Sequence, residues 1–272
     1  MRDDHAVTVR STLRIVVATL RRRPTLCGPF FVAGVVTAVV GAVRTTRTAA
    51  FGSRVAPQSG FTGVFAYPVP MPVSAVGSVP VMWVEWPWRS AVATGGLTLL
   101  VATTGVWATV VVVRRTVSEG GGRQPDDRPS LSPTQPVRLL AYHSVVTAFF
   151  AVITLVEIDR RVEIPLTLSF LYLVGRTFLV PAGVIAGRGL RASVRWSWRQ
   201  SRGHTVTFLV VAAVLGIGGQ FLVEGPAILF PNLTALLTGG AGTVLATTVA
   251  GTTHAVAIGR VGGRLEAGDQ TG

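Results

Sequence analysis

Thr205–Val223, TVTFLVVAAVLGIGGQFLV, is an apolar run without a charged residue, and runs of this kind decide the fold of the chain. A hydrocarbon layer of roughly 30 Å is crossed by about 20 apolar residues in a helix. Within that layer only a helix satisfies its backbone N–H and C=O groups from inside one segment. The other five runs are approximately Pro24–Val43, Ser90–Val113, Leu139–Val156, Ile164–Gly187 and Leu233–Ile258. The sequence therefore predicts an all-α, polytopic transmembrane bundle of six spans.

The composition agrees with a membrane protein. Charged residues make up 14% of the chain, well below the roughly 25% of a soluble domain. The net charge of +13 would indicate a nucleic-acid partner in a soluble protein. Here the arginines collect where spans end, so we expect no nucleic-acid partner. The single cysteine, Cys27, excludes an internal disulfide and a multi-cysteine metal cage.

The distribution of arginine predicts the orientation. Eighteen arginines fall in the N-terminal arm, the second and fourth loops and the tail, whereas six fall in the first and third loops. Cytoplasmic loops carry the excess of positive charge. An even number of spans also requires both termini to lie on one side. We therefore expect a multi-pass protein of the cell membrane with both termini in the cytoplasm.

The predicted organisation divides at a segment rich in glycine and proline, which cannot bury a core of its own. This segment separates two spans from the other four. The predicted parts are a cytoplasmic N-terminal arm (1–23), a two-span front with a long outer loop (24–113), a flexible cytoplasmic linker (114–138), a four-span back (139–259) and a cytoplasmic tail (260–272).

The second half of the long outer loop, Phe61–Trp88, combines five prolines with Trp83, Trp86 and Trp88. Proline at this density excludes a continuous helix, and tryptophan favours the headgroup level of a bilayer. The segment is therefore either a loop on the outer membrane surface or a lid over a central cavity. The sequence leaves both open.

The sixth span carries a small residue at every fourth position. Such a ridge allows a second helix to approach closely. Packing within one chain is the expected use, and a homo-oligomer is the alternative. The ridge runs through Gly239, Thr243, Thr247, Gly251, Ala255 and Gly259, and its first four residues are the candidate oligomer seam.

Arg176 is the one arginine in the middle of a predicted span. A charge at this depth costs about 2.5–3.5 kcal/mol and therefore suggests a function or a partner. We expect an ion pair with Glu157 or Glu224, which lie near the outer ends of their spans. Binding of an anionic ligand or lipid headgroup, and snorkelling to the surface, are the alternatives.

Motifs for catalysis are missing from the sequence. It contains no His-x-x-x-His, no Gly-x-Ser-x-Gly and no phosphate-binding Gly-x-x-x-x-Gly-Lys. All acidic residues lie at or beyond the ends of the predicted spans, so the usual pattern of proton or sodium coupling is not seen. The sequence therefore predicts a protein that is not an enzyme, with no catalytic residue, metal or cofactor.

The most distinctive segment is Arg188–Arg202, RGLRASVRWSWRQSR. In a helix its arginines fall on one stripe about 80° wide, beside an apolar stripe of Leu190, Val194 and Trp198. Such a helix lies in the membrane interface with its arginines toward phosphates, each contributing about 1 kcal/mol near an anionic surface. The pattern fits topological anchoring as well as recognition of a particular lipid or protein, and anionic lipids are the expected partner. The predicted contact residues are Arg188, Arg191, Arg195, Arg199, Arg202 and Trp198.

The region from Arg176 to Gly203 also carries a family resemblance. It has a basic residue ahead of a Phe-x-x-Pro-Ala step, followed by Ser-Trp-x-x-Ser-Arg-Gly. These features resemble a superfamily of six-span prokaryotic membrane domains. That group includes the membrane domain of glycerophosphoryl diester phosphodiesterases and related archaeal domains of unknown function. The resemblance implies a membrane-embedded, lipid-associated module without the catalytic phosphodiesterase domain.

Two functions follow as expectations. The first is a non-catalytic membrane module that contacts anionic lipid headgroups through Arg188–Arg202. The second is a small permease with Arg176 in a central substrate cavity and the segment Trp83–Trp88 as its lid. A polar cavity around Arg176 would favour the permease.

Overall fold

The computed structural model describes residues 8–50, 87–120, 132–155, 160–230, 232 and 234–270, and every regular element in these ranges is a helix. Five helical segments are long and apolar enough to cross a membrane: Pro24–Val43, Gly95–Val117, Leu168–Ile185, Thr205–Leu229 and Leu237–Leu265. The expected all-α membrane protein is thus confirmed at this level. The third predicted span corresponds to α5, which is not among these five. The segment Phe61–Trp88 lies outside the described residues up to Trp86.

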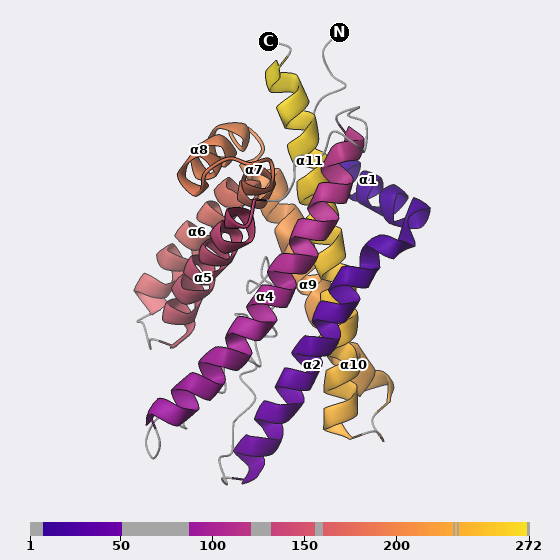
Figure 1. Cartoon of the computed structure of the whole chain (residues 1–272), viewed down its shortest axis with the longest axis vertical. Helices are drawn as coiled ribbons and strands as arrows, with labels where there is room; N and C mark the ends of the chain where they lie inside the picture. The colour runs from indigo at the N-terminus through magenta and orange to yellow at the C-terminus, as the bar shows by residue number, and fades with distance from the viewer. Residues whose placement is uncertain are drawn as a thin grey trace.

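Figure 1 shows the described helices in chain order. A single 3-10 turn, Pro24–Leu26, joins the first two helices, and a π-helical turn, Thr247–Gly251, joins the last two. The α-helices are α1 (Val9–Arg22), α2 (Cys27–Ala50), α4 (Pro87–Gly120), α5 (Thr134–Leu155), α6 (Arg160–Thr177), α7 (Val180–Ile185), α8 (Leu190–Gln200), α9 (Thr205–Leu229), α10 (Ala235–Ala246) and α11 (Thr252–Gln270).

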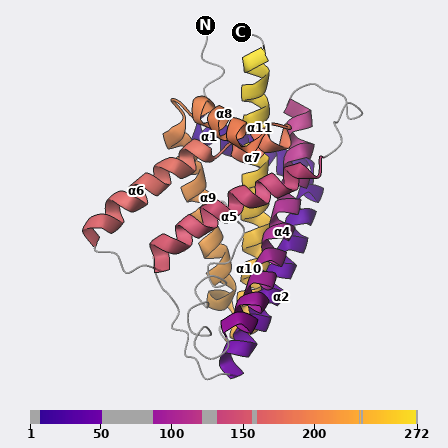
Figure 2. The same ribbon diagram turned by 60° about the vertical axis from the view of Figure 1, so that its left-hand side comes forward.

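The long helices form two groups. α2 and α4 pack against each other and against the rod made by α10 and α11, and α9 packs on α10. α5 and α6 tilt away from this group and rejoin it where α7 and α8 lie (Figure 2). Helices of the predicted front pack on helices of the predicted back, because α2 contacts α10 and α4 contacts α11.

Several predicted boundaries fall inside helices. The linker was expected to begin at 114 and end at 138, yet α4 continues to Gly120 and α5 begins at Thr134. The tail was expected from 260, yet α11 continues to Gln270. These helices are longer than the apolar runs, because helical hydrogen bonding does not stop where hydropathy falls. Residues 121–131 lie outside the described ranges.

The N-terminal arm contains a docked amphipathic helix that the hydropathy pattern did not predict. A capping box between Thr8 and Ser11 begins α1. Its inner face buries Thr12, Val16 and Thr19 against α11 and α9. Its arginines remain exposed, since they occupy the opposite face. α1, α7, α8 and the last turns of α11 lie at one end of the bundle, which we call the α8 end (Figure 1).

The small-residue ridge packs within the chain. A Cβ on Gly251 would lie 2.7 Å from Cε1 of Phe30 in α2, and one on Gly259 would lie 3.0 Å from Cβ of Thr116 in α4. Thr243 and Thr247 are buried. Close helix approach is thus confirmed inside one chain. A homo-oligomer through Gly239, Thr243, Thr247 and Gly251 stays a prediction, and it would have to displace α2.

Candidate functional site

The site begins with a break between α6 and α7. Pro181 has no N–H, so the carbonyl of Thr177 lacks its usual donor four residues later. α6 accordingly ends at Thr177 and α7 begins at Val180. The hydroxyl of Tyr142 in α5 donates to the Thr177 carbonyl oxygen at 3.2 Å. The predicted fourth span is therefore two helices, and the carbonyl at the break has a partner from a neighbouring helix.

Ser197 of α8 bridges the same break. Its hydroxyl donates to the Arg176 carbonyl oxygen at 2.7 Å and accepts from the Leu179 N–H at 3.2 Å. Both backbone groups would bond inside a continuous helix, and Ser197 replaces those bonds. The side chain of Ser197 is fully buried. α8 is therefore anchored to the break by hydrogen bonds.

Close packing of α7 on α8 adds to this anchoring. A Cβ on Gly183 would lie 3.0 Å from Cβ of Ser193, so glycine at this position allows the two helices to approach closely. Trp196 is 2% exposed, and Ser193 and Ser201 are fully buried. The buried face of α8 is thus small and mostly polar, with one large aromatic residue.

Arg176 lies in the last turn of α6, because the helix ends one residue later. Its Nε donates to the Tyr172 hydroxyl at 2.9 Å, and its Nη1 donates to the Trp198 carbonyl oxygen at 3.1 Å and to Ser201 Oγ at 3.4 Å. The guanidinium also lies over the rings of Trp198, at 4.8 Å, and Tyr172, at 5.3 Å. Arg176 therefore joins α6 to the C-terminal turn of α8.

The expected ion pair between Arg176 and Glu224 is not formed. Glu224 is exposed within α9, where its Oε1 accepts from Nε2 of Gln220 at 2.6 Å. The physical reason is the break at Pro181, which places Arg176 at the α8 end and within reach of carbonyl and hydroxyl oxygens. The other predicted partner, Glu157, lies outside the described residues.

Most arginines of the segment Arg188–Arg202 lie away from the buried face of α8. Arg191, Arg195, Arg199 and Arg202 are exposed. Arg188 differs, since its guanidinium lies 4.6 Å from the centre of the Trp196 ring. Four of the five predicted arginines therefore lie on the surface at the α8 end.

The apolar stripe of α8 differs from the prediction. Leu190 and Val194 are partly buried against the protein core instead of facing lipid alone. Trp196 is the aromatic residue in the core, whereas Trp198 is half-buried beside Arg176. α8 therefore docks on protein through one edge and presents the other.

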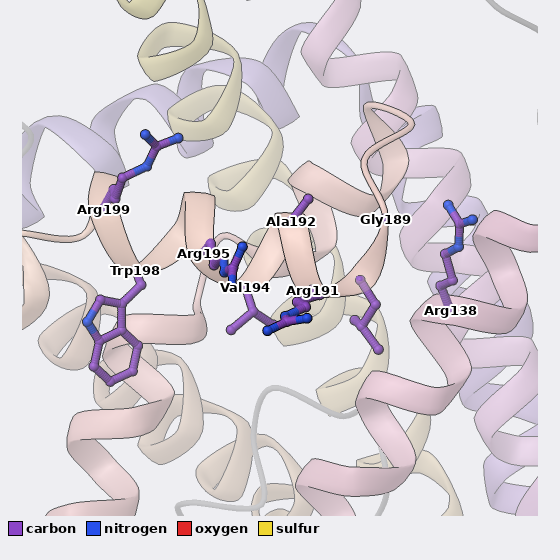
Figure 3. A pocket seen from close by; sticks show the side chains of 9 residues that line it. Arg138, Gly189, Arg191, Ala192, Val194, Arg195, Trp198 and Arg199 are labelled. Atoms are coloured by element: carbon purple, nitrogen blue, oxygen red, sulfur yellow. The ribbon is translucent and has the colours of Figure 1, made fainter.

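A groove of about 1070 Å³ runs along α8, and both its exposed arginines and the partly buried residues of its apolar edge line it. Figure 3 shows Arg191, Arg195 and Arg199 following one another along α8, while Arg138 stands on the neighbouring helix beyond Gly189. None of the residues that line it carries a carboxylate, so the groove is suited to anions. We call it the α8 groove. It is lined by Arg138, Gly189, Leu190, Arg191, Ala192, Val194, Arg195, Trp198 and Arg199.

Arg138 is the residue of the groove that sequence reasoning missed as a contact. In the sequence it was only one of the arginines that set orientation. It lies in the first turns of α5. No spacing rule connects it to α8, because the two segments meet only in the folded structure. Arg188 and Arg202, which the stripe included, do not line the groove.

Replacing Ser197 with alanine tests the anchoring of α8. The change leaves the Arg176 carbonyl and the Leu179 N–H without their partner, and an unsatisfied buried group costs about 1–3 kcal/mol. We expect a lower midpoint of thermal unfolding in detergent micelles. Ser193→Ala is the control, since among the described residues the Ser193 hydroxyl donates to the carbonyls of Gly189 and Arg188, which immediately precede its own helix. Equal midpoints for the two variants would contradict the anchoring role.

The motif residues between Arg176 and Gly203 have structural roles at the break. The proline of the Phe-x-x-Pro-Ala step opens the helix, and Ser197 of the Ser-Trp run bonds to the opened backbone. Membership of the six-span superfamily stays a prediction. Comparisons with protein-family models, with curated proteins and with solved structures find no match to the chain.

Proposed function

We propose that the chain is a non-catalytic membrane module that binds anionic lipid headgroups in the α8 groove. One observation carries the proposal: four arginines from two helices line a single groove whose lining residues include no carboxylate. Each arginine near an anionic surface contributes about 1 kcal/mol. The groove therefore attracts phosphate, whereas its lining holds no group for acid or base chemistry.

The location of the groove supports lipid over a soluble anion. α8 lies across the end of the bundle, beside helices that are long enough to cross a membrane (Figure 2). The α8 end is also the end where the positive-inside rule predicts cytoplasm. The cytoplasmic leaflet carries the anionic lipids, and basic juxtamembrane segments are attracted to it. Leu190, Val194 and Trp198 give the groove an apolar part that suits the acyl side of a headgroup.

The anchoring of α8 supports binding as well. Ser197 and Arg176 hold the helix against α6, so the backbone that carries the three α8 arginines is fixed before a lipid arrives. A preorganised site loses less conformational entropy on binding than a mobile segment does. The arrangement therefore favours retention of particular headgroups over transient attraction.

The test compares lipid retention in two matched triple variants. R191Q/R195Q/R199Q removes three charges from the groove, whereas R10Q/R14Q/R21Q removes three exposed charges from α1 at the same end. Each protein is reconstituted in equimolar phosphatidylglycerol and phosphatidylcholine, and the retained lipids are identified by native mass spectrometry. We expect the groove variant to lose its preference for phosphatidylglycerol by about tenfold or more.

The α1 variant is expected to keep most of that preference. A wild-type protein that retains the two lipids equally would refute the proposed function. An equal loss in the two variants would show that the attraction comes from total charge and not from the groove.

The permease hypothesis has less support in the described residues. Arg176 was its substrate-binding residue, yet the guanidinium is engaged by Tyr172, Trp198 and Ser201. Arg176 also does not line the α8 groove. Because no contact among the described residues favours transport over lipid binding, we propose only the lipid-binding module.

A further inference from the structure

We infer that the α8 groove prefers a phospholipid with two phosphates in its headgroup, joined by a short linker, over a phospholipid with one. This inference rests on the proposed function and names the lipid class for the same site. It follows from the number of arginines, from their spacing and from the size of the groove.

The number of arginines exceeds what one phosphodiester can pair. A phosphodiester carries a single negative charge and is typically bound by one bidentate guanidinium or by two neighbouring ones. The groove presents four guanidinium groups and no carboxylate among its lining residues. A headgroup with two phosphates allows each phosphate to take a pair of arginines. The charge of the lining is then better balanced than with one phosphate.

The spacing of the arginines also favours two phosphates. Arg191, Arg195 and Arg199 are separated by four residues each, which corresponds to about 6 Å per step along a helix. Arg138 stands on α5, beyond Gly189 in the view of Figure 3. The positive charges therefore extend along the groove instead of converging on one point. Two phosphates on a three-carbon linker match an extended array better than one phosphate does.

The volume of the groove fits a large headgroup. Ligand pockets commonly have volumes of about 300–1,000 Å³, and the groove, at about 1070 Å³, lies just above this range. Gly189 and Ala192 leave space between the arginines, because neither has a long side chain. Leu190, Val194 and Trp198 supply apolar contacts for the glycerol and the first acyl carbons. Basic pockets beside transmembrane helices are a known setting for headgroups with several phosphates.

The test compares two bilayers that contain equal total amounts of phosphate and of acyl chains. The protein is reconstituted in phosphatidylcholine with either diphosphatidylglycerol or twice as much phosphatidylglycerol, so that phosphate and acyl chains are equal. Bound lipid is measured by native mass spectrometry over a titration. We expect the wild type to retain diphosphatidylglycerol about tenfold more strongly at matched phosphate.

The variants separate the groove from the remaining positive surface. R138Q removes the arginine that α5 contributes, and R191Q removes one from α8. In each variant, the retention of diphosphatidylglycerol should be within about twofold of the retention of phosphatidylglycerol. R202Q removes an equal charge from the same stripe outside the groove and should leave the preference unchanged. Unchanged midpoints of thermal unfolding show that the variants are folded.

The possible failures are distinguishable. Equal retention of the two anionic lipids, with both above phosphatidylcholine, would overturn the two-phosphate inference and leave the proposed function intact. Retention of neither above phosphatidylcholine would overturn both. A loss in R202Q as large as that in R138Q would also overturn the inference, because the preference would then follow total charge.

Discussion

Replacing Arg176 with methionine is expected to lower the free energy of unfolding by about 2–4 kcal/mol. The variant keeps a long side chain but loses the hydrogen bonds to Tyr172, Trp198 and Ser201 and the cation–π contacts with two aromatic rings. Hydrogen bonds from a charged group contribute about 1.5–3 kcal/mol each where they are shielded from water. The Trp198 carbonyl, in the last turn of α8, also loses a positive donor that suits a helix C-terminus.

Two further variants identify the origin of this loss. Arg176→Lys keeps the charge, but an ammonium cannot reach the Tyr172 hydroxyl and the Trp198 carbonyl with one planar fork. We therefore expect an intermediate stability, measured by SDS-induced unfolding in mixed micelles. Tyr172→Phe removes only the hydroxyl that accepts from Arg176 Nε at 2.9 Å. The double variant Arg176→Met/Tyr172→Phe should show a coupling energy of about 0.5–3 kcal/mol between the two positions. Wild-type stability in Arg176→Met would contradict the tie between α6 and α8.

Helical periodicity predicted which face of α8 is exposed, but it did not predict that the apolar edge of α8 packs against protein. The four arginines Arg191–Arg202 are on the surface, as the stripe required. The pattern could not distinguish an apolar edge that faces lipid from one that faces protein, because hydrocarbon and a protein core select the same side chains. Trp196 illustrates the difference: it lies outside the predicted stripe, yet it is the tryptophan of α8 that is buried in the core.

Proline had different effects at two positions, and the sequence alone does not separate them. At Pro181 the helix opens, because Tyr142 and Ser197 from other helices bond to the exposed backbone. At Pro226 the helix α9 continues to Leu229, past the expected end of the span at Val223. Pro226 lies in the last turns of α9, and its carbonyl still accepts from the Phe230 N–H at 3.0 Å. Partners far away in the sequence thus decide whether a proline ends a helix.

The same limit explains why the sequence predicted part of the groove and missed the rest. Three of its arginines come from one helix and recur every four residues, so the sequence pattern reveals them. Arg138 comes from α5, so its place depends on how α5 packs against α7 and α8. Arg176 was correctly selected as unusual, but its partners could not be deduced, since the break at Pro181 changes which end of the bundle it reaches.

The close approach of α9 and α10 leads to the second large expected effect. Gly242 of α10 faces the backbone of α9: a Cβ at this position would lie 2.8 Å from the carbonyl carbon of Val223 and 2.9 Å from its Cα. A backbone cannot rotate away as a side chain can, so the two helices must separate. Gly242→Ala is therefore expected to lower the free energy of unfolding by about 2–3 kcal/mol, the upper part of the usual cost of overpacking.

Gly240→Ala is the matched control, since it lies on the same helix and a Cβ there meets nothing within 4 Å. Alanine favours a helix over glycine by about 1 kcal/mol, so this variant should be neutral or slightly more stable. The opposite signs of the two changes in stability matter more than either value. Both variants add the same Cβ to a glycine of α10, and they differ only in the atoms that this Cβ meets. Thermal unfolding of both proteins in the same detergent measures the difference. Equal midpoints would mean that α9 and α10 are not in contact at Val223, and the packing of the whole α10–α11 rod on α9 would have to be revised.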